Sequence, residues 1–141
     1  MKFGRRLCRD DKGAAAIEMA FALPAFVLMT WMLLQLAQVY RAVAGIQHAL
    51  GQGARFATLC VNPTGAGCDA PTAAQIQTRV NESVYGIGPG TFDVPLPLAG
   101  TAGTSAFFDV TVDYTQPTNL LLLPGPTITV TRSKRVWVAA T

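Results

Sequence analysis

The sequence has few residues of the kinds that carry chemistry. Charged side chains make up 13% of the 141 residues, cysteine occurs three times, and His48 is the single histidine. We find no nucleophile elbow and no paired histidines, and the glycines at 86, 88 and 90 follow no predicted strand. A zinc site at the cysteines would need two further ligands, and only His48 is near. We therefore predict no catalytic, cofactor-binding or metal-binding residues, and no enzyme.

Net charge is concentrated at the start of the chain. Residues 1–13 contain five basic and two acidic side chains, and this surplus of three equals the formal net charge of +3 for the whole sequence. The remainder is neutral, so the basic balance does not indicate nucleic acid as a partner. A basic segment ahead of an apolar one is typical of a terminus that stays in the cytoplasm.

No charged side chain occurs between Glu18 and Arg41. As a helix rising about 1.5 Å per residue, the segment from Met19 to Tyr40 would cover roughly 33 Å, and a bilayer hydrocarbon core is about 30 Å thick. The segment predicts a transmembrane helix in contact with membrane lipid, with Tyr40 at the outer interface. Pro24 lacks an N–H and predicts either a tolerated proline or a helix kink that helps subunits pack.

Two ordinary explanations of the apolar segment are open. Ala42-Val43-Ala44 resembles a secretory cleavage site ahead of Gly45, but a signal peptide has an apolar region of about 7–15 residues, which is shorter than this one. An uncleaved signal anchor fits the length. Neither explains the residues from Gly13 to Glu18.

The segment Gly13-Ala14-Ala15-Ala16-Ile17-Glu18 lies between the basic leader and the apolar helix. It resembles a type IV prepilin processing site, in which a membrane peptidase cuts after the glycine and a glutamate occupies the fifth mature position. The resemblance implies cleavage between Gly13 and Ala14, which would put Glu18 in that position. It also implies a prepilin peptidase as a partner.

Further residues narrow the resemblance to the TadE-like pseudopilins of tight-adherence (Tad) pilus systems. Such chains begin with glycine, small residues, an aliphatic residue and glutamate, then have a proline, and later have a Gly-Ala-Arg-aromatic-Ala segment. In this sequence the proline is Pro24 and the later segment is residues 53–57. Met19 departs from the phenylalanine that is common after the glutamate. The resemblance implies further partners, namely other pseudopilins, the major pilin and the inner-membrane assembly platform.

The position of Glu18 beside an uncharged helix indicates a functional role. A carboxylate at the centre of a membrane costs about 2.5–3.5 kcal/mol on insertion scales, so Glu18 should have a partner. Cleavage would create one, because the new ammonium group of Ala14 could pair with Glu18 of the same or a neighbouring subunit and fix the register between helices. The alternative is a solvated Glu18 in the headgroup region beside Arg9 and Lys12.

The residues after the apolar segment predict a continuous helix and a small domain. No proline occurs from Arg41 to Leu59, so we expect the helix to continue to about residue 58. Gly45, Ala49 and Gly53 recur every four residues, which predicts a helix-packing face. Cys60 and Cys68 bracket a turn-rich loop, and we expect them to form a disulfide in an oxidising compartment.

The rest of the chain predicts one short helix and a small antiparallel sheet. We expect a helix over residues 71–85 with Ile76, Val80 and Val84 on its apolar face, and strands over residues 108–115 and 127–138. Residues 91–98 could add an edge strand, since Pro95 and Pro97 exclude a central one. Between the strands lies Leu120-Leu121-Leu122-Leu123, which we expect to pack on the sheet, with membrane or partner contact as alternatives.

Together these features predict an α+β chain with a leader at residues 1–13, a transmembrane and extended helix at 14–59, and a small extracytoplasmic domain at 60–141. We expect an inner-membrane protein with a cytoplasmic N-terminus that takes part in Tad pilus biogenesis, initiation or adhesion, in the membrane or in the fibre. The alternative is an uncleaved single-pass protein whose outer domain binds or senses an envelope component.

Overall fold

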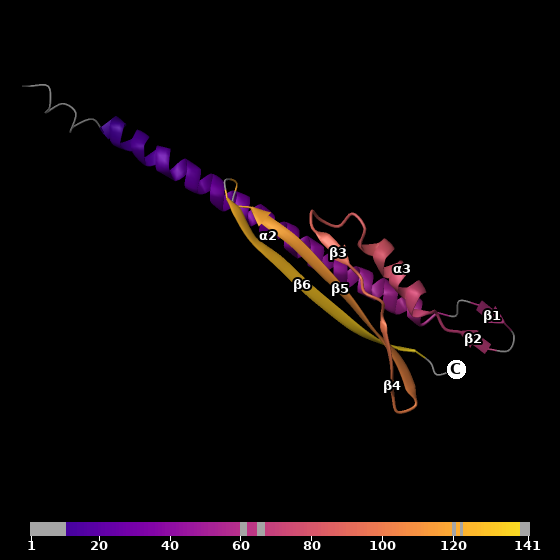
Figure 1. Ribbon diagram of the computed structural model, residues 1–141. Helices are drawn as coiled ribbons and strands as arrows, with labels where there is room; N and C mark the ends of the chain where they lie inside the picture. Colours follow the sequence, from indigo (N-terminus) through magenta and orange to yellow (C-terminus); the bar gives the residue numbers. More distant parts are fainter. Residues whose placement is uncertain (1–10, 60–61, 65–66, 120, 122, 139–141) are drawn as a thin grey trace, which may run out of the picture.

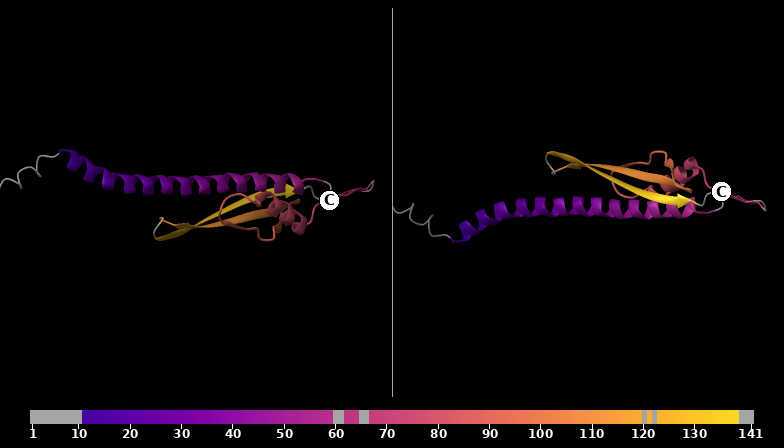
Figure 2. Two further views of the ribbon diagram at one scale, coloured as in Figure 1. Left: turned by 90° about the horizontal axis from the view of Figure 1, so that it is seen from above. Right: turned by 90° about the horizontal axis from the view of Figure 1, so that it is seen from below.

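A computed structural model describes residues 11–59, 62–64, 67–119, 121 and 123–138. One long helix, α2 (Asp11–Ala57), runs along most of the molecule, and a small domain lies along its C-terminal half (Figure 1). The N-terminal part of α2 projects beyond this domain and is bent relative to the rest of the helix (Figure 2). The predicted α+β fold, with a long apolar helix, a short helix and a small antiparallel sheet, is confirmed.

Helix α2 ends within a residue of the predicted boundary. Its last turn is closed by Thr58, whose backbone N–H and side-chain Oγ1 both donate to the Arg55 carbonyl, at 3.2 Å and 2.8 Å. These bonds satisfy an acceptor that a helix end otherwise leaves to water. Two short strands follow, β1 (Asn62–Thr64) and β2 (Gly67–Asp69), which pair as a hairpin that was not predicted from the sequence.

The short helix is α3 (Ala73–Val84), and Thr72 caps it. The Gln75 N–H donates to Thr72 Oγ1 at 3.4 Å, and the Thr72 N–H donates to Gln75 Oε1 at 2.9 Å, which completes a capping box. Pro71 therefore precedes the cap and does not lie in the first turn. The predicted apolar face is confirmed, because Ile76, Val80 and Val84 are all buried.

The sheet is built around one long central strand, β5 (Ser105–Asn119), with antiparallel neighbours on both edges. Strand β6 (Pro124–Val138) pairs with β5 along almost its whole length, from Ala106 opposite Val138 to Asn119 opposite Pro124. On the other edge β3 (Thr91–Asp93) and β4 (Leu98–Ala102) pair with successive parts of β5. Both predicted main strands exist and extend further than their alternating segments.

The single edge strand expected over residues 91–98 is divided in the structure. Residues 94–97, which include Pro95 and Pro97, separate β3 from β4. Proline has no N–H to donate to a ladder, so two of them in four residues interrupt the pairing with β5. The separation leaves Val94 buried in the core and lets the Gln77 side-chain amide donate to the Val94 carbonyl at 2.7 Å.

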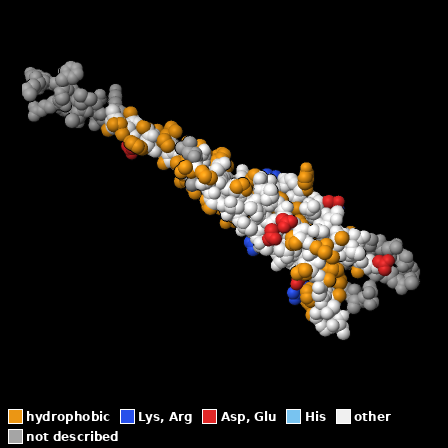
Figure 3. Space-filling model, viewed as in Figure 1, with side chains coloured by type: hydrophobic (Ala, Val, Ile, Leu, Met, Phe, Trp, Pro, Cys, Tyr) orange, Lys and Arg blue, Asp and Glu red, His pale blue; other side chains and the backbone are white. Residues whose placement is uncertain are grey.

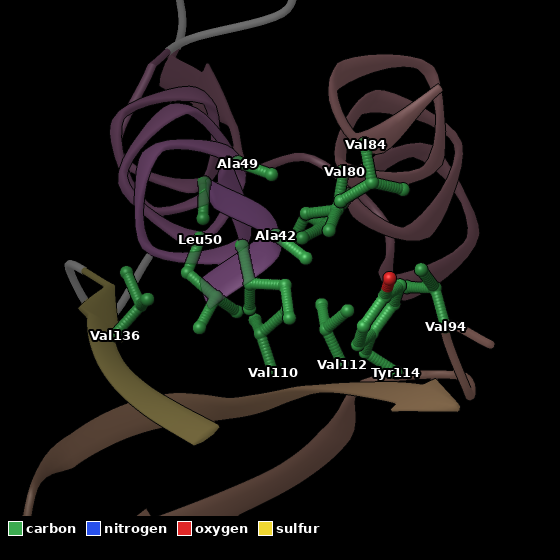
Figure 4. Close-up of a cluster of buried hydrophobic side chains, with 13 residues drawn as sticks. Ala42, Ala49, Leu50, Val80, Val84, Val94, Val110, Val112, Tyr114 and Val136 are labelled. Atoms are coloured by element: carbon green, nitrogen blue, oxygen red, sulfur yellow. The ribbon is translucent and has the colours of Figure 1, made fainter. Parts of the chain in front are cut away.

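The core lies between the two helices and one face of the sheet (Figure 4). Helix α2 contributes residues at the 3–4 spacing of one helical face, and α3 and β5 contribute side chains that point toward them. The core residues labelled in the figure are Ala42, Ala49, Leu50, Val80, Val84, Val94, Val110, Val112, Tyr114 and Val136. The C-terminal half of α2 therefore shares its core with residues 60–141, and the division proposed at residue 59 stays a prediction.

A chain of hydrogen-bonded polar groups, buried at Tyr114 and Gln116, connects the sheet to α2. The Gly90 N–H donates to the Tyr114 hydroxyl at 3.2 Å, and that hydroxyl donates to Gln116 Oε1 at 2.6 Å. The Gln116 amide then donates to Gln38 Oε1 on α2 at 3.4 Å. Burial raises the pKa of Tyr114 above its ordinary value of 10, against a smaller opposing effect of the Gly90 N–H.

Tyr114 should make the stability of the fold sensitive to alkaline pH. Because its pKa is higher in the folded state, the folded chain keeps a proton that the unfolded chain loses, so stability falls as pH rises above 10. Tyr114→Phe should lower the unfolding free energy at pH 7 by about 1 kcal/mol, and it should flatten the alkaline decline. Urea unfolding of the chain in detergent at several pH values measures both. An equal alkaline decline in the variant would contradict this assignment.

Candidate assembly segment

The predicted processing site lies in the first turns of α2. Gly13, Ala14 and Glu18 are all exposed, and a Cβ placed on Gly13 would meet no atom within 4 Å. Ala14 and Glu18 are four residues apart, so they lie on the same side of the helix, about 6 Å apart along its axis. Within the described residues, Glu18 has no hydrogen-bond or ion-pair partner of its own chain.

The same end of α2 exposes a continuous apolar surface. Side chains from Ile17 to Leu36 are exposed on all sides of the helix, and they form most of the orange surface on the projecting part of the molecule (Figure 3). Among the described residues, α2 is the one helix long and apolar enough to cross a membrane. No part of its apolar window is buried against the rest of the chain, in contrast to the core helix of a soluble protein. Helix α2 therefore has the properties of a membrane anchor.

The folded domain makes contact with α2 well before the predicted outer interface at Tyr40. Trp31 Nε1 donates to the Asn119 carbonyl at 3.1 Å and to its side-chain Oδ1 at 3.2 Å. Gln35 contacts the same residue, accepting from the Asn119 N–H at 3.2 Å and donating to the Asn119 carbonyl. The end of the β5–β6 hairpin is thereby fixed to the apolar segment of the helix. The sequence did not predict this contact, although a glutamine in an apolar helix is a signal that a polar partner is needed.

The small residues of α2 face other parts of the same chain. A Cβ on Gly45 would come within 2.5 Å of Ile87, and one on Gly53 would overlap Val80 of α3. Ala49, between them, is fully buried in the core. This face therefore lets α3 and the segment after it approach α2 closely.

Four other residues were singled out in the sequence. Pro24 lies inside α2, which is helical on both sides of it, and its role as a kink stays a prediction. Cys60 lies outside the described residues and Cys68 lies in the backbone of β2, so the predicted disulfide falls outside what the structure describes. His48 is exposed on α2, and the described part of the chain has no group of three side chains that could hold a metal ion.

The outer face of the sheet carries a small charged and aromatic group. The Arg135 guanidinium donates to both oxygens of Asp109, at 2.8 Å and 2.7 Å, and lies 4.0 Å from the centre of the Phe107 ring. Trp137 packs edge-on against Phe107, with 5.3 Å between ring centres. The Arg135 hydrogen bonds lower the pKa of Asp109. This exposed pairing joins β5 to β6 on the face opposite the helices.

Comparison with known proteins gives one match. Residues 13–55, which are 43 of the 141 residues, match the model of the family described as TadE-like protein. No curated protein and no solved structure matches the chain. The match begins at Gly13 and ends two residues before the end of α2, so it covers the apolar helix and its outward continuation. The N-terminal helix of this chain is therefore similar to that of TadE-like proteins.

Proposed function

We propose that this chain is a pilin-like subunit, a TadE-like pseudopilin or minor pilin, that a prepilin peptidase cuts after Gly13 and that takes part in building a Tad-type pilus. The observation that carries the proposal is the match of the TadE-like family to residues 13–55, on a helix that exposes Gly13, Glu18 and an apolar surface. Residues 1–13 are then a leader, and the N-terminus of the uncut chain lies in the cytoplasm. The domain lies on the outer side of the membrane.

The position of Gly13 suits proteolysis. A peptidase needs an extended substrate, and the bond after Gly13 lies in the first turn of α2, where the helix is easiest to unwind. Glycine costs about 1 kcal/mol more than alanine in a helix interior, which further lowers the cost of opening this turn. Gly13 also has no side chain that could obstruct an approaching active site.

Cleavage would place a positive charge at the N-terminus of a helix in the membrane. The helix dipole is already positive at that end, so the ammonium group of Ala14 is unfavourable there without a nearby anion. Glu18, one turn further on, supplies that anion, either to its own chain or to a neighbour. A pair between subunits would fix their relative height, and we propose that this is the role of Glu18 in assembly.

The structure provides an argument against cleavage near Ala44. Helix α2 is continuous across that position, and Val39 and Ala42 on its N-terminal side are buried in the domain core. A cut there would remove these side chains and the Gln38 partner of the buried Gln116. The uncleaved anchor with an envelope-binding outer domain leaves the core intact, and it is the alternative that the experiment below separates.

The proposed partners follow from the exposed surface of α2. The apolar side chains from Ile17 to Leu36 would contact lipid in the membrane and the helices of other pseudopilins or the major pilin in an assembly. The inner-membrane assembly platform would move the subunit from the lipid bilayer into the assembly. We propose no catalytic role for this chain.

Glu18→Ala tests the assembly role. The variant should insert into the membrane and be cut as the wild type is, because its helix keeps its apolar length. Pilus output from cells complemented with the variant should fall about tenfold or more. A tenfold fall corresponds to the loss of an ion pair worth about 1.4 kcal/mol. Pili sheared from cells and quantified by immunoblot give the measurement. Glu82→Ala is the matched control, since Glu82 is an exposed glutamate on α3.

Normal pilus output from the Glu18→Ala strain would contradict the proposal that Glu18 fixes the relative height of neighbouring subunits. Normal output together with a full-length, uncut chain would favour the uncleaved anchor instead. A fall in the Glu82→Ala strain of the same size would show that loss of an exposed carboxylate is harmful in general, and it would remove the case for Glu18.

A further inference from the structure

The β5–β6 hairpin points back along α2 toward its N-terminus (Figures 1 and 2). Its end is fixed to the helix at Trp31 and Gln35 through the backbone of Asn119. At about 1.5 Å per residue, Trp31 lies about 20 Å from Glu18 along the axis and Gln35 about 26 Å. A hydrocarbon core of about 30 Å that starts at Glu18 extends past both residues. If the core starts at Ala14, it ends close to Gln35. In either case the end of the hairpin lies at or below the outer headgroups.

A polypeptide segment at the level of the headgroups is stabilised when the backbone polar groups next to the lipid have partners within the chain. Asn119 at the end of β5 meets this condition, because Gln35 bonds both its N–H and its carbonyl, and Trp31 donates a further hydrogen bond to that carbonyl. The Thr118 hydroxyl donates to the Pro126 carbonyl at 2.6 Å across the hairpin. Pro124 and Pro126 have no N–H that would need a partner.

The two described leucines at the end of the hairpin have exposed side chains. Leu121 is 50% exposed and Leu123 is 66% exposed. Leu121 also has a φ of 66°, a left-handed conformation in which glycine or asparagine is the less strained choice. Neither packing within the chain nor the geometry of the turn therefore accounts for leucine at this position.

An apolar groove of about 750 Å³ lies between the hairpin and α2. Its walls are Met29, Met32 and Leu36 on the helix and Pro126 and Ile128 on β6. In water, such a groove would be a hydrated apolar surface at a cost proportional to its area. Its helix wall belongs to the predicted membrane span, so the same environment that surrounds α2 reaches the groove.

We infer that the β5–β6 hairpin end is a second membrane contact, in which Leu121 and Leu123 insert among the phospholipids of the outer leaflet and the acyl chains fill the groove. Trp31 and Gln35 hold the inserted end against the helix. The molecule is then held in the bilayer at two points, which restricts its rotation about the axis of α2. The inference rests on the membrane anchorage that is part of the proposed function, and it goes beyond the processing and assembly roles.

The test uses the full chain reconstituted in vesicles of phosphatidylethanolamine and phosphatidylglycerol. An environment-sensitive fluorescent amino acid replaces Leu121 in one sample and Thr104 in the other. Thr104 is an exposed turn residue between β4 and β5, at the opposite end of the sheet. Quenching is measured with aqueous iodide and with lipids that carry a nitroxide on the acyl chain. Flotation of the vesicles after a carbonate wash shows whether the chain is anchored.

We expect the fluorophore at position 121 to be quenched by the nitroxide lipid, with an iodide quenching constant at least fivefold lower than at position 104. Equal iodide quenching at the two positions in chains that float would overturn the inference and leave the anchor intact. Chains that do not float would overturn both the hairpin contact and the membrane anchorage of α2. Protection that disappears when lipid is raised tenfold over protein would show that a second copy covers the hairpin end, and this would also overturn it.

Discussion

Gly13→Val is expected to leave the chain uncut in the membrane. A β-branched side chain at the residue before the scissile bond would obstruct a peptidase site that accepts glycine, and a displaced scissile bond costs about 100-fold in rate. The structure makes this variant informative, because a Cβ at Gly13 meets nothing within 4 Å and the position is exposed. The substitution should therefore leave the fold unchanged. An immunoblot against the C-terminal domain should show the full-length chain accumulating.

Gly51→Val is the control for the Gly13 variant. A Cβ at Gly51 also meets no atom within 4 Å, so the two substitutions place the same side chain at an open position of the same helix. The control should be cut at the wild-type rate. Normal cutting of Gly13→Val would show that the processing site lies elsewhere, and slow cutting of both variants would show an effect on the helix in general.

Gly53→Leu is expected to destabilise the folded domain by about 3 kcal/mol. A Cβ at Gly53 would overlap Cγ2 of Val80, which is fully buried in the core and has no space to move away. Relief would require α3 to separate from α2, which would open the apolar contact between the two helices. Urea unfolding of the chain in detergent, followed by circular dichroism, measures the loss.

A leucine at Gly51 should change the free energy of unfolding in the opposite direction. Gly51 lies two residues from Gly53 in the same helix but faces open space, so leucine there should stabilise the chain by up to about 1 kcal/mol through helix propensity. An equal loss of stability in both variants would mean that α3 does not pack against Gly53. A stabilised Gly53→Leu variant would contradict the helix contact directly.

The long helix was predictable because its signals are local. An uncharged segment of 22 residues from Met19 to Tyr40, with no proline from Arg41 to Leu59, is enough to specify one continuous helix. The alternation of apolar residues in 108–115 similarly specifies a half-buried strand. The ends of β5 and β6 were underestimated, because residues such as Gln116 and Pro117 break the alternation while the partner strand still pairs with them.

The docking of the hairpin on α2 was not predictable in the same way. Trp31 and Asn119 are 88 residues apart, and their contact depends on the length and twist of two strands that the sequence only outlines. The four leucines were expected to pack on the sheet, whereas Leu121 and Leu123 are exposed. The predicted processing site and Glu18 are the reverse case, because they are predicted from a sequence motif, while the structure shows only that these residues are exposed.

The identity of the first residue of the native protein tests the central claim most directly. Intact mass and N-terminal sequencing of the chain extracted from membranes should give a polypeptide that starts at Ala14, with a free amine one helical turn from Glu18. A chain that still begins with Met1, or one trimmed near Gly45, would contradict the account of how this subunit is made and aligned.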